Sequence, residues 1–245
     1  MNSTIETILN HKSIRKFKDT AITHHQLDLI IRAAQQASTS SYMMAYTIIG
    51  ITDPTKKAVL AEVSGQPYVK DNGHLLVFCA DLHRPTKQAS EEDFSQMTEN
   101  LENSEHFLVS AIDAALAAQN AAIAAESMGL GICYLGSLRN NLGKVDELLS
   151  LPKHVIPLFG MAIGEPAHGP DRKPRLPKQA VYFENEYQEH DESINQFDEQ
   201  MATYYQSRSS NNRADTWTKQ MHRRFAKTIR MDVTDLVQKK GFNKR

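Results

Sequence analysis

The chain has 245 residues, enough for one domain or two small ones, and a core of that size needs no disulfide or metal to stabilise it. Hydrophobic residues make up 40% and charged residues 23% of the sequence, as in ordinary globular proteins. A formal net charge of −1 argues against a broad basic surface for nucleic acid. Polar residues interrupt every apolar run before it reaches the length of a membrane span, so we expect no membrane partner.

Several chemical classes are disfavoured because their motifs are missing from the sequence. Cys79 and Cys133 lie in apolar runs and are predicted to be buried thiols, not a disulfide or a metal pair. Without CxxC or HExxH we expect no metal site. The sequence also lacks GxGxxG after a strand, GxxxxGK[ST] and GxSxG, which disfavours an ordinary dinucleotide fold, a P-loop and a hydrolase. No signal-peptide pattern opens the chain, and we expect a cytoplasmic protein.

Capping signals and apolar spacing predict alternating helices and strands in the first half of the chain. Ser3 and Glu6 form a capping-box pattern ahead of a first helix, which should end near Asn10. Thr23 and Gln26 form the same pattern ahead of a second helix. The elements expected next are a strand over 45–51, a helix over 56–63, a buried strand over 74–81 and a polar, acidic surface excursion over 83–104.

The longest predicted helix, over 107–128, is rich in alanine and apolar around most of its circumference. Such a helix must be enclosed by protein, either as plain core or partly by a second subunit. The elements expected after it are strands over 132–135 and 156–163 with a short helix between them, an extended piece over 181–183, and helices over 194–205, 217–229 and 233–240. Together these predict an α+β fold with about four core strands.

Two short basic segments stand out in a nearly neutral chain, HKSIRK over 11–16 and RKPRLP over 172–177. They combine arginine, lysine, serine and histidine donors that suit a phosphate. Charge alone favours a simpler alternative, two solvated loops. Because no reactive constellation of side chains accompanies them, the pattern is typical of a protein that holds a cofactor and lets the cofactor react.

Four ordered motifs and a tail carry a family resemblance. They are HKSIRKF at 11–17, STSS at 38–41, ESMGLG leading to YLGSLRNN over 126–141, KPRLP at 173–177 and SNNRADTW at 210–217. The chain resembles, end to end, the FMN-dependent nitroreductase family, and most closely its NADPH-dependent nitroreductase and flavin oxidoreductase branch. The resemblance implies a single α+β sandwich over residues 1–245, with a central sheet flanked by helices. It also implies an intertwined homodimer, FMN at the subunit interface and a helical C-terminal arm from about residue 185.

The resemblance also implies roles for individual residues. Those matching FMN-binding positions are His11, Ser13, Arg15, Thr39, Ser40, Ser41, Gln66, Tyr134, Gly136, Ser137, Lys173 and Arg175. Arg208 and Arg213 match positions that bind NADPH. No side chain is expected to be catalytic, because FMN carries the chemistry. The chain departs from the family pattern at Ser137, where a second glycine is frequent, and at Pro67, which should stiffen its loop.

Two functions follow from this resemblance. In the first, the protein is an enzyme: NADPH reduces FMN, and nitroaromatics, quinones or free flavins then take the electrons in a ping-pong cycle. In the second, it is a non-catalytic FMN store or redox sensor. The segment over 207–213, with its two arginines and no apolar anchor, is expected to order around the 2′-phosphate of NADPH, which a simple FMN store would not need.

Overall fold

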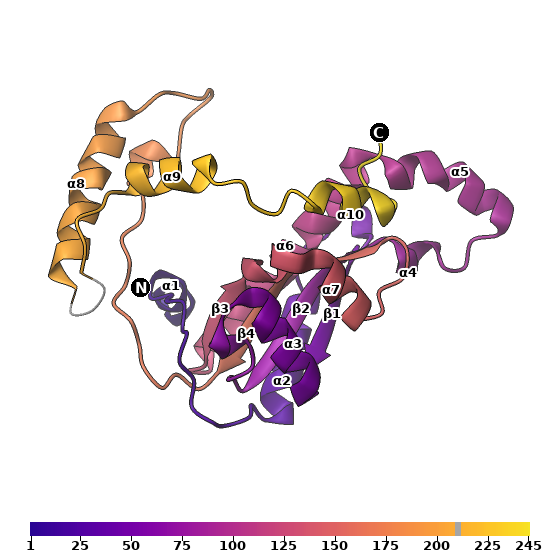
Figure 1. The fold of residues 1–245 in the computed structure, drawn as a ribbon, viewed down its shortest axis with the longest axis horizontal. Coiled ribbons are helices and arrows are strands. Elements are labelled where there is room, and N and C mark those ends of the chain that lie inside the picture. The colour runs from indigo at the N-terminus through magenta and orange to yellow at the C-terminus, as the bar shows by residue number, and fades with distance from the viewer. Residues whose placement is uncertain (209–211) are drawn as a thin grey trace. The chain divides into compact units, whose positions relative to one another are not determined.

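The computed structural model describes residues 1–208 and 212–245 (Figure 1). Two compact units can be separated within it. The first comprises residues 1–170 together with 230–245, and the second comprises residues 171–229. The expected single domain with an arm from about residue 185 stays a prediction.

In the described part of the chain, four strands form one antiparallel sheet in the order β1-β2-β4-β3. Their bounds are Tyr46–Ile51 for β1, His74–Asp81 for β2, Gly131–Leu135 for β3 and Val155–Gly164 for β4. Every residue of β2 is buried, as its unbroken apolar run predicts for a strand covered on both faces. The four predicted strands are therefore confirmed, and β2 has the predicted bounds.

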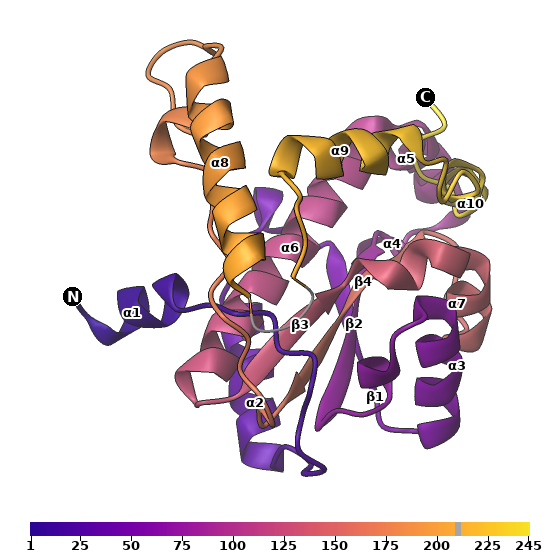
Figure 2. The same cartoon turned by 60° about the vertical axis from the view of Figure 1, so that its left-hand side comes forward.

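Helices cover both faces of this sheet, and Figure 2 shows them from the side. Helices α2 (His24–Gln35) and α6 (Ser104–Ser127) pack on the face that carries Leu76 and Phe78. Helices α3 (Pro54–Ser64) and α7 (Leu142–Leu148) pack on the opposite face. The predicted α+β sandwich with a central sheet between helices is confirmed.

Capping explains where the first helices begin. In α1 (Ser3–Leu9) the cap is Asn2, whose side chain accepts a hydrogen bond from Ile5 N, so the predicted role of Ser3 as the cap is wrong. In α2 the predicted capping box between Thr23 and Gln26 is present. Asp53 caps α3, and Gly65 ends it with a left-handed φ of 65°.

The predicted surface excursion over 83–104 is mostly helical. It contains α4 (His83–Thr86) and α5 (Glu91–Glu102). Ser90 caps α5 by accepting a hydrogen bond from Asp93 N. Three acidic residues follow in the first turn, where their negative charges interact favourably with the helix dipole. The acidic run within the predicted excursion is therefore a helix start.

Helix α6 is the longest helix described, and its two sides differ. Six buried alanines pack in the core with α2 and the sheet: Ala114, Ala117, Ala118, Ala121, Ala122 and Ala125. On the outward side, Leu108, Ile112 and Leu116 are 54%, 55% and 43% exposed. Among the described helices α6 alone is long and apolar enough to span a membrane, but its buried alanines make it a core helix here.

The remaining elements complete the two units. They are the short 3-10 helices η1 (Ser40–Tyr42), η2 (Pro67–Val69), η3 (Gly136–Asn141) and η4 (Lys178–Ala180), with α8 (Asp191–Ser207), α9 (Trp217–Ala226) and α10 (Val233–Lys239). The expected extended piece over 181–183 is irregular backbone after η4, not a strand. Cys79 and Cys133 are buried free thiols, as predicted.

A buried histidine lies where the C-terminal segment returns to the first unit. The His154 ring stacks on Phe94 at 5.7 Å and lies edge-on to Phe242 at 6.2 Å. A Cβ on Gly241 would lie 2.4 Å from His154 Nε2, so the ring fits only against a glycine. Burial, reinforced by the nearby Lys153, lowers the pKa of His154 to about 4.

We predict that this histidine makes the protein less stable in mild acid. Between its ordinary pKa of 6.5 and about 4, the unfolded chain binds a proton that the native ring does not. The free energy of unfolding should therefore fall by about 1–3 kcal/mol between about pH 7.5 and about pH 4.5. Urea denaturation at a series of pH values measures this. His154→Asn, which tolerates the native φ of 62°, should flatten the dependence, and an unchanged slope would contradict the prediction.

Candidate functional site

The basic N-terminal loop is fixed along the outer edge of β3. Ser13 pairs with Ile132 in a parallel bridge, and Ile14 N donates a hydrogen bond of 2.9 Å to Ile132 O. A Cβ on Gly131 would lie 2.5 Å from Ile14 Cγ1, so the loop can approach this closely only because position 131 is a glycine. The backbone that carries the predicted donors His11, Ser13 and Arg15 is thereby held against the sheet.

His11 is held by an acid from the end of α6. Its Nδ1 lies 2.7 Å from Glu126 Oε1. Such a contact fixes the ring orientation and leaves Nε2 for another partner. Glu126 belongs to the matched ESMGLG motif, but sequence reasoning gave it no role, because only the fold brings α6 to the N-terminal loop.

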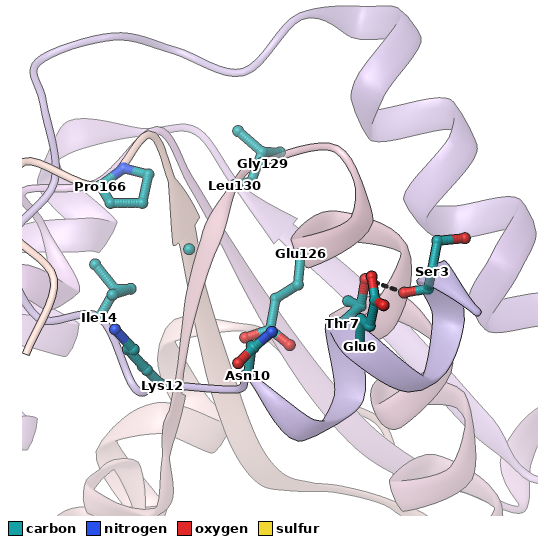
Figure 3. A pocket seen from close by; sticks show the side chains of 11 residues that line it. Ser3, Glu6, Thr7, Asn10, Lys12, Ile14, Glu126, Gly129, Leu130 and Pro166 are labelled. Carbon is teal, nitrogen blue, oxygen red and sulfur yellow. Dashed lines mark hydrogen bonds between the residues drawn. The ribbon is translucent and has the colours of Figure 1, made fainter. Parts of the chain in front are cut away.

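A cavity of about 420 Å³ lies on one side of this loop (Figure 3). It is lined by α1 and its following residues, Lys12, Ile14, Glu126, the turn at 129–131 and Pro166. Lys12 and Ile14 line it, whereas the alternate positions 11, 13 and 15 do not. The predicted FMN-binding residues His11, Ser13 and Arg15 therefore do not line this cavity.

Arg15 reaches a tyrosine that the sequence did not single out. Burial raises the pKa of Tyr68, the neighbouring Cys133 adds to the rise, and a hydrogen bond with Arg15 opposes it. Tyr68 lies in η2, directly after Gln66 and Pro67. Gln66 is extended, with φ −130°, and Pro67 begins the 3-10 helix. Arg15 and the loop of Gln66 are thus neighbours, and the expected stiffening of this loop by Pro67 stays a prediction.

The turn after β3 is tied to the end of α3. Ser137 and Ser64 share a hydrogen bond between their hydroxyl oxygens. At Gly136 a Cβ would lie 3.2 Å from Arg139 Nη2, so a side chain there would crowd the turn. Tyr134 O–H reaches Gln119 Oε1 at 3.4 Å, and burial, with Glu126 adding to it, raises its pKa. The departure at Ser137 therefore has a structural partner within the fold.

A second group of predicted residues, Thr39, Ser40 and Ser41, is anchored by a buried carboxylate on α6. Asp113 is 1% exposed and accepts hydrogen bonds of 3.0 Å from Ser40 N and from Ala45 N. The loop between these anchors is strained, with positive φ at three residues other than glycine, Ser41, Tyr42 and Met44. Arg84 also donates to the carbonyl oxygen of Met44, at 3.1 Å.

Sequence reasoning missed Asp113, although a clue was present. It is an acid inside an otherwise apolar, alanine-rich helix, and a buried acid needs donors. Which donors it would find could not be read from the chain, because Ser40 and Ala45 are about seventy residues away in sequence.

Along α6 the two anchoring acids, Asp113 and Glu126, are thirteen residues apart. At 1.5 Å per residue this separates them by about 20 Å. The hydroxyl-bearing residues 39–41 and the loop at 11–15 are therefore anchored at separate places along this helix within one chain. Gln66, Tyr134, Gly136 and Ser137 belong with the loop, through the contacts of Arg15 and of β3.

The remaining predicted residues lie in the second unit. Lys173, Arg208 and Arg213 all approach one aromatic ring, that of Tyr205. Arg175 instead turns its Nη1 to the carbonyl oxygen of Lys173, at 2.8 Å. Part of the segment expected to order around NADPH, residues 209–211, lies outside the described residues. No cluster of three or more possible metal ligands occurs among the residues that the structure describes.

Comparison with known families and proteins gives consistent matches over nearly the whole chain. The family model described as Nitroreductase family matches residues 8–165, and the model for its C-terminal domain matches residues 173–245. A Bacillus subtilis (strain 168) protein named FMN reductase (NADPH) is 53% identical over 249 aligned positions, covering 100% of both chains. A Staphylococcus haemolyticus (strain JCSC1435) protein named NADPH-dependent oxidoreductase is 44% identical, covering 96% of each chain.

Solved structures agree with these matches. The NfrA1 nitroreductase of B. subtilis superposes with a TM-score of 0.95 at 52% identity, covering 99% of this chain and 100% of that chain. The NADPH:FMN oxidoreductase of Vibrio harveyi, solved as a complex with NAD+, has a TM-score of 0.90 at 39% identity and covers 100% of both chains. The chain therefore belongs to the nitroreductase family.

Proposed function

We propose that this protein is an FMN-dependent oxidoreductase that takes its electrons from NADPH. The observation that carries the proposal is similarity over the full length, at 53% identity, to a protein named FMN reductase (NADPH). The loop of His11, Ser13 and Arg15, fixed along β3, adds a local reason, because it holds phosphate donors on a rigid backbone.

The donors on the chain fit FMN. A phosphate dianion is bound best by several charge-assisted donors, and the loop offers an imidazole, a hydroxyl and the guanidinium of Arg15, which is an exposed residue. We assign Lys173 and Arg175 to the same phosphate by their match to the family motif. The hydroxyls of 39–41 and the amide of Gln66 suit the ribityl chain and the ring of the flavin, which present both donors and acceptors.

When bound, FMN supplies the redox chemistry, accepting two electrons from NADPH and passing them to an oxidant. The side chains hold and orient the two cofactors, and none needs to act as a general acid or base. We propose Arg208 and Arg213 as the residues that bind the 2′-phosphate of NADPH. Nitroaromatics, quinones and free flavins are the proposed oxidants, and a cytoplasmic location stays a prediction.

We further propose a homodimer with FMN bound between subunits. Two observations support it. Leu108, Ile112 and Leu116 form an exposed apolar stripe, spaced four residues apart on one side of α6. The loop at 11–15 and the hydroxyl-bearing residues 39–41 are anchored about 20 Å apart along the same helix. A partner chain packed on α6 could bring its own hydroxyl-bearing residues 39–41 to the flavin, which the loop at 11–15 of the first chain holds.

The enzymatic function is tested by mixing the purified, FMN-loaded protein anaerobically with NADPH in a stopped-flow spectrometer. The flavin absorbance should be lost within seconds and return when a quinone or a nitroaromatic is added. An FMN store would keep its yellow colour with NADPH, which is the outcome that favours the alternative. Failure to take up FMN at all would reject both functions.

We predict that Arg15→Ala raises the dissociation constant for FMN by about 10- to 150-fold. This corresponds to about 1.5–3 kcal/mol, the range for a hydrogen bond to a charged group. Fluorescence titration of the apoprotein with FMN measures it. Arg32→Ala is the matched control, because Arg32 pairs with Asp28 on the surface of α2. If the two variants bind FMN with equal affinity, residues 11–16 form only a solvated loop and not a phosphate site.

We predict that Ile112→Glu converts the dimer to monomers, because each copy would place a charge in the centre of the apolar stripe. Sedimentation equilibrium measures the mass. Met97→Glu places the same charge at an exposed apolar residue of α5 and should leave the dimer intact. A wild-type protein that sediments as a yellow monomer would reject the dimer proposal outright.

A further inference from the structure

Tyr205 is a buried tyrosine near the end of α8 for which neither the sequence nor the mechanism has supplied a role. It is 2% exposed and clusters with Phe197 and Met201, with Trp217 packed against them. Its hydroxyl donates a hydrogen bond of 3.0 Å to Gln220 Oε1 on α9. Packing on all sides and a bonded hydroxyl fix the plane of the ring.

Three cations from separate stretches of the second unit meet at this ring. Arg213 Cζ lies 4.3 Å from the ring centroid, Lys173 Nζ 5.7 Å and Arg208 Cζ 6.0 Å. Each is within the distance at which the face of an aromatic ring attracts a cation. We call Lys173, Arg208 and Arg213 the Tyr205 cation cluster.

The three cations are held to different degrees. Arg213 is the most constrained, because its Nη2 donates to Gln220 Oε1 at 3.0 Å and its Nε lies 3.4 Å from Asp215 Oδ2. The same carboxylate pairs with Arg223 at 2.7 Å. Arg208 instead lies against two rings, those of Tyr204 and Tyr205, which occupy none of its N–H donors.

The cations around Tyr205 also shift the pKa of its hydroxyl. Burial favours a higher pKa for Tyr205, but hydrogen bonds with Lys173, Gln220 and Arg213 outweigh it and lower the pKa below the ordinary value. Like charges gathered in this way repel one another, and an anion placed among them relieves that repulsion.

We propose that Tyr205 is a positioning residue for the nucleotide phosphate: its ring, which Lys173 also approaches, sets the geometry in which Arg208 and Arg213 meet the 2′-phosphate of NADPH. The proposal rests on the proposed function, which assigns the two arginines to that phosphate. It adds Tyr205 to that assignment, and it makes Arg213 the more rigidly held of the two arginines. Because NADH lacks the 2′-phosphate, Tyr205 should affect the choice between the nucleotides more than the rate of turnover.

The test compares Tyr205→Leu with Tyr205→Phe. Leucine removes the ring, whereas phenylalanine keeps the ring and removes only the hydroxyl. For Tyr205→Leu we expect the ratio of kcat/KM for NADPH to kcat/KM for NADH to fall by about fivefold or more, with kcat for NADH unchanged. Tyr205→Phe should stay within about twofold of wild type. Tyr182→Leu is the matched control, because Lys178 lies 4.8 Å from the centroid of that ring and outside the cluster.

A second measurement avoids turnover and flavin chemistry altogether. Calorimetric titration with 2′-phospho-ADP-ribose and with ADP-ribose should show that Tyr205→Leu weakens only the phosphorylated ligand. If Tyr205→Leu does not fold, Tyr205→Met, which fills the core and carries no ring, takes its place. Equal losses for both ligands would show that Tyr205 only supports the fold, and no loss for either would show that the ring does not position the cations. Both outcomes overturn the proposal.

The failure of this inference can be told apart from failure of the proposed function. If wild type binds 2′-phospho-ADP-ribose no better than ADP-ribose, the assignment of Arg208 and Arg213 fails, and with it the inference. If Arg208→Ala loses the preference for the phosphorylated ligand and Tyr205→Leu keeps it, the function stands and only the role of Tyr205 is rejected.

Discussion

The packing of the alanine side of α6 against the sheet and α2 is the contact on which the rest of the first unit depends. Alanine side chains let the helix approach the sheet closely, and the buried ones are Ala114, Ala117, Ala118, Ala121, Ala122 and Ala125. This close approach fixes both stretches of α6 that bear anchoring acids. Asp113 accepts hydrogen bonds from the backbone of the strained loop at 40–45, and Glu126 contacts the ring of His11. One helix thereby places two groups of candidate flavin-binding residues.

The same helix leaves its other side uncovered, with the apolar stripe at Leu108, Ile112 and Leu116. A side of this kind on a core helix is unusual in a chain that folds alone, and it lies on the same helix as the two separated groups. The proposed second copy of the chain would explain both the exposed stripe and the separation of the two groups. Strain in the 40–45 loop fits this view, because strained backbone tends to occur where a ligand or partner is held.

In the second unit the organising group is an aromatic ring. Sequence motifs assign Lys173 to one cofactor and the two arginines to another, but the structure gathers all three at Tyr205. A tyrosine followed by a polar segment gives no such signal by itself. The ring becomes informative only when α8 and α9 bury it and Gln220 fixes its hydroxyl.

Local pattern in the sequence determined the strands, the capping box at Thr23, the long helix and the family motifs, because periodicity and capping act over a few residues. It also marked His11, Ser13 and Arg15 as donors. It misplaced the cap of α1, and it described the acidic stretch before α6 only as a surface excursion, without its helices, since a helix start and a loop favour the same residues. Only the tertiary structure decided that Asp113 binds the loop at 40–45, that Glu126 binds His11 and that three cations share Tyr205. Such contacts join residues from different elements or from distant parts of the chain, and folding alone determines which of the many possible partners a buried acid or ring will meet.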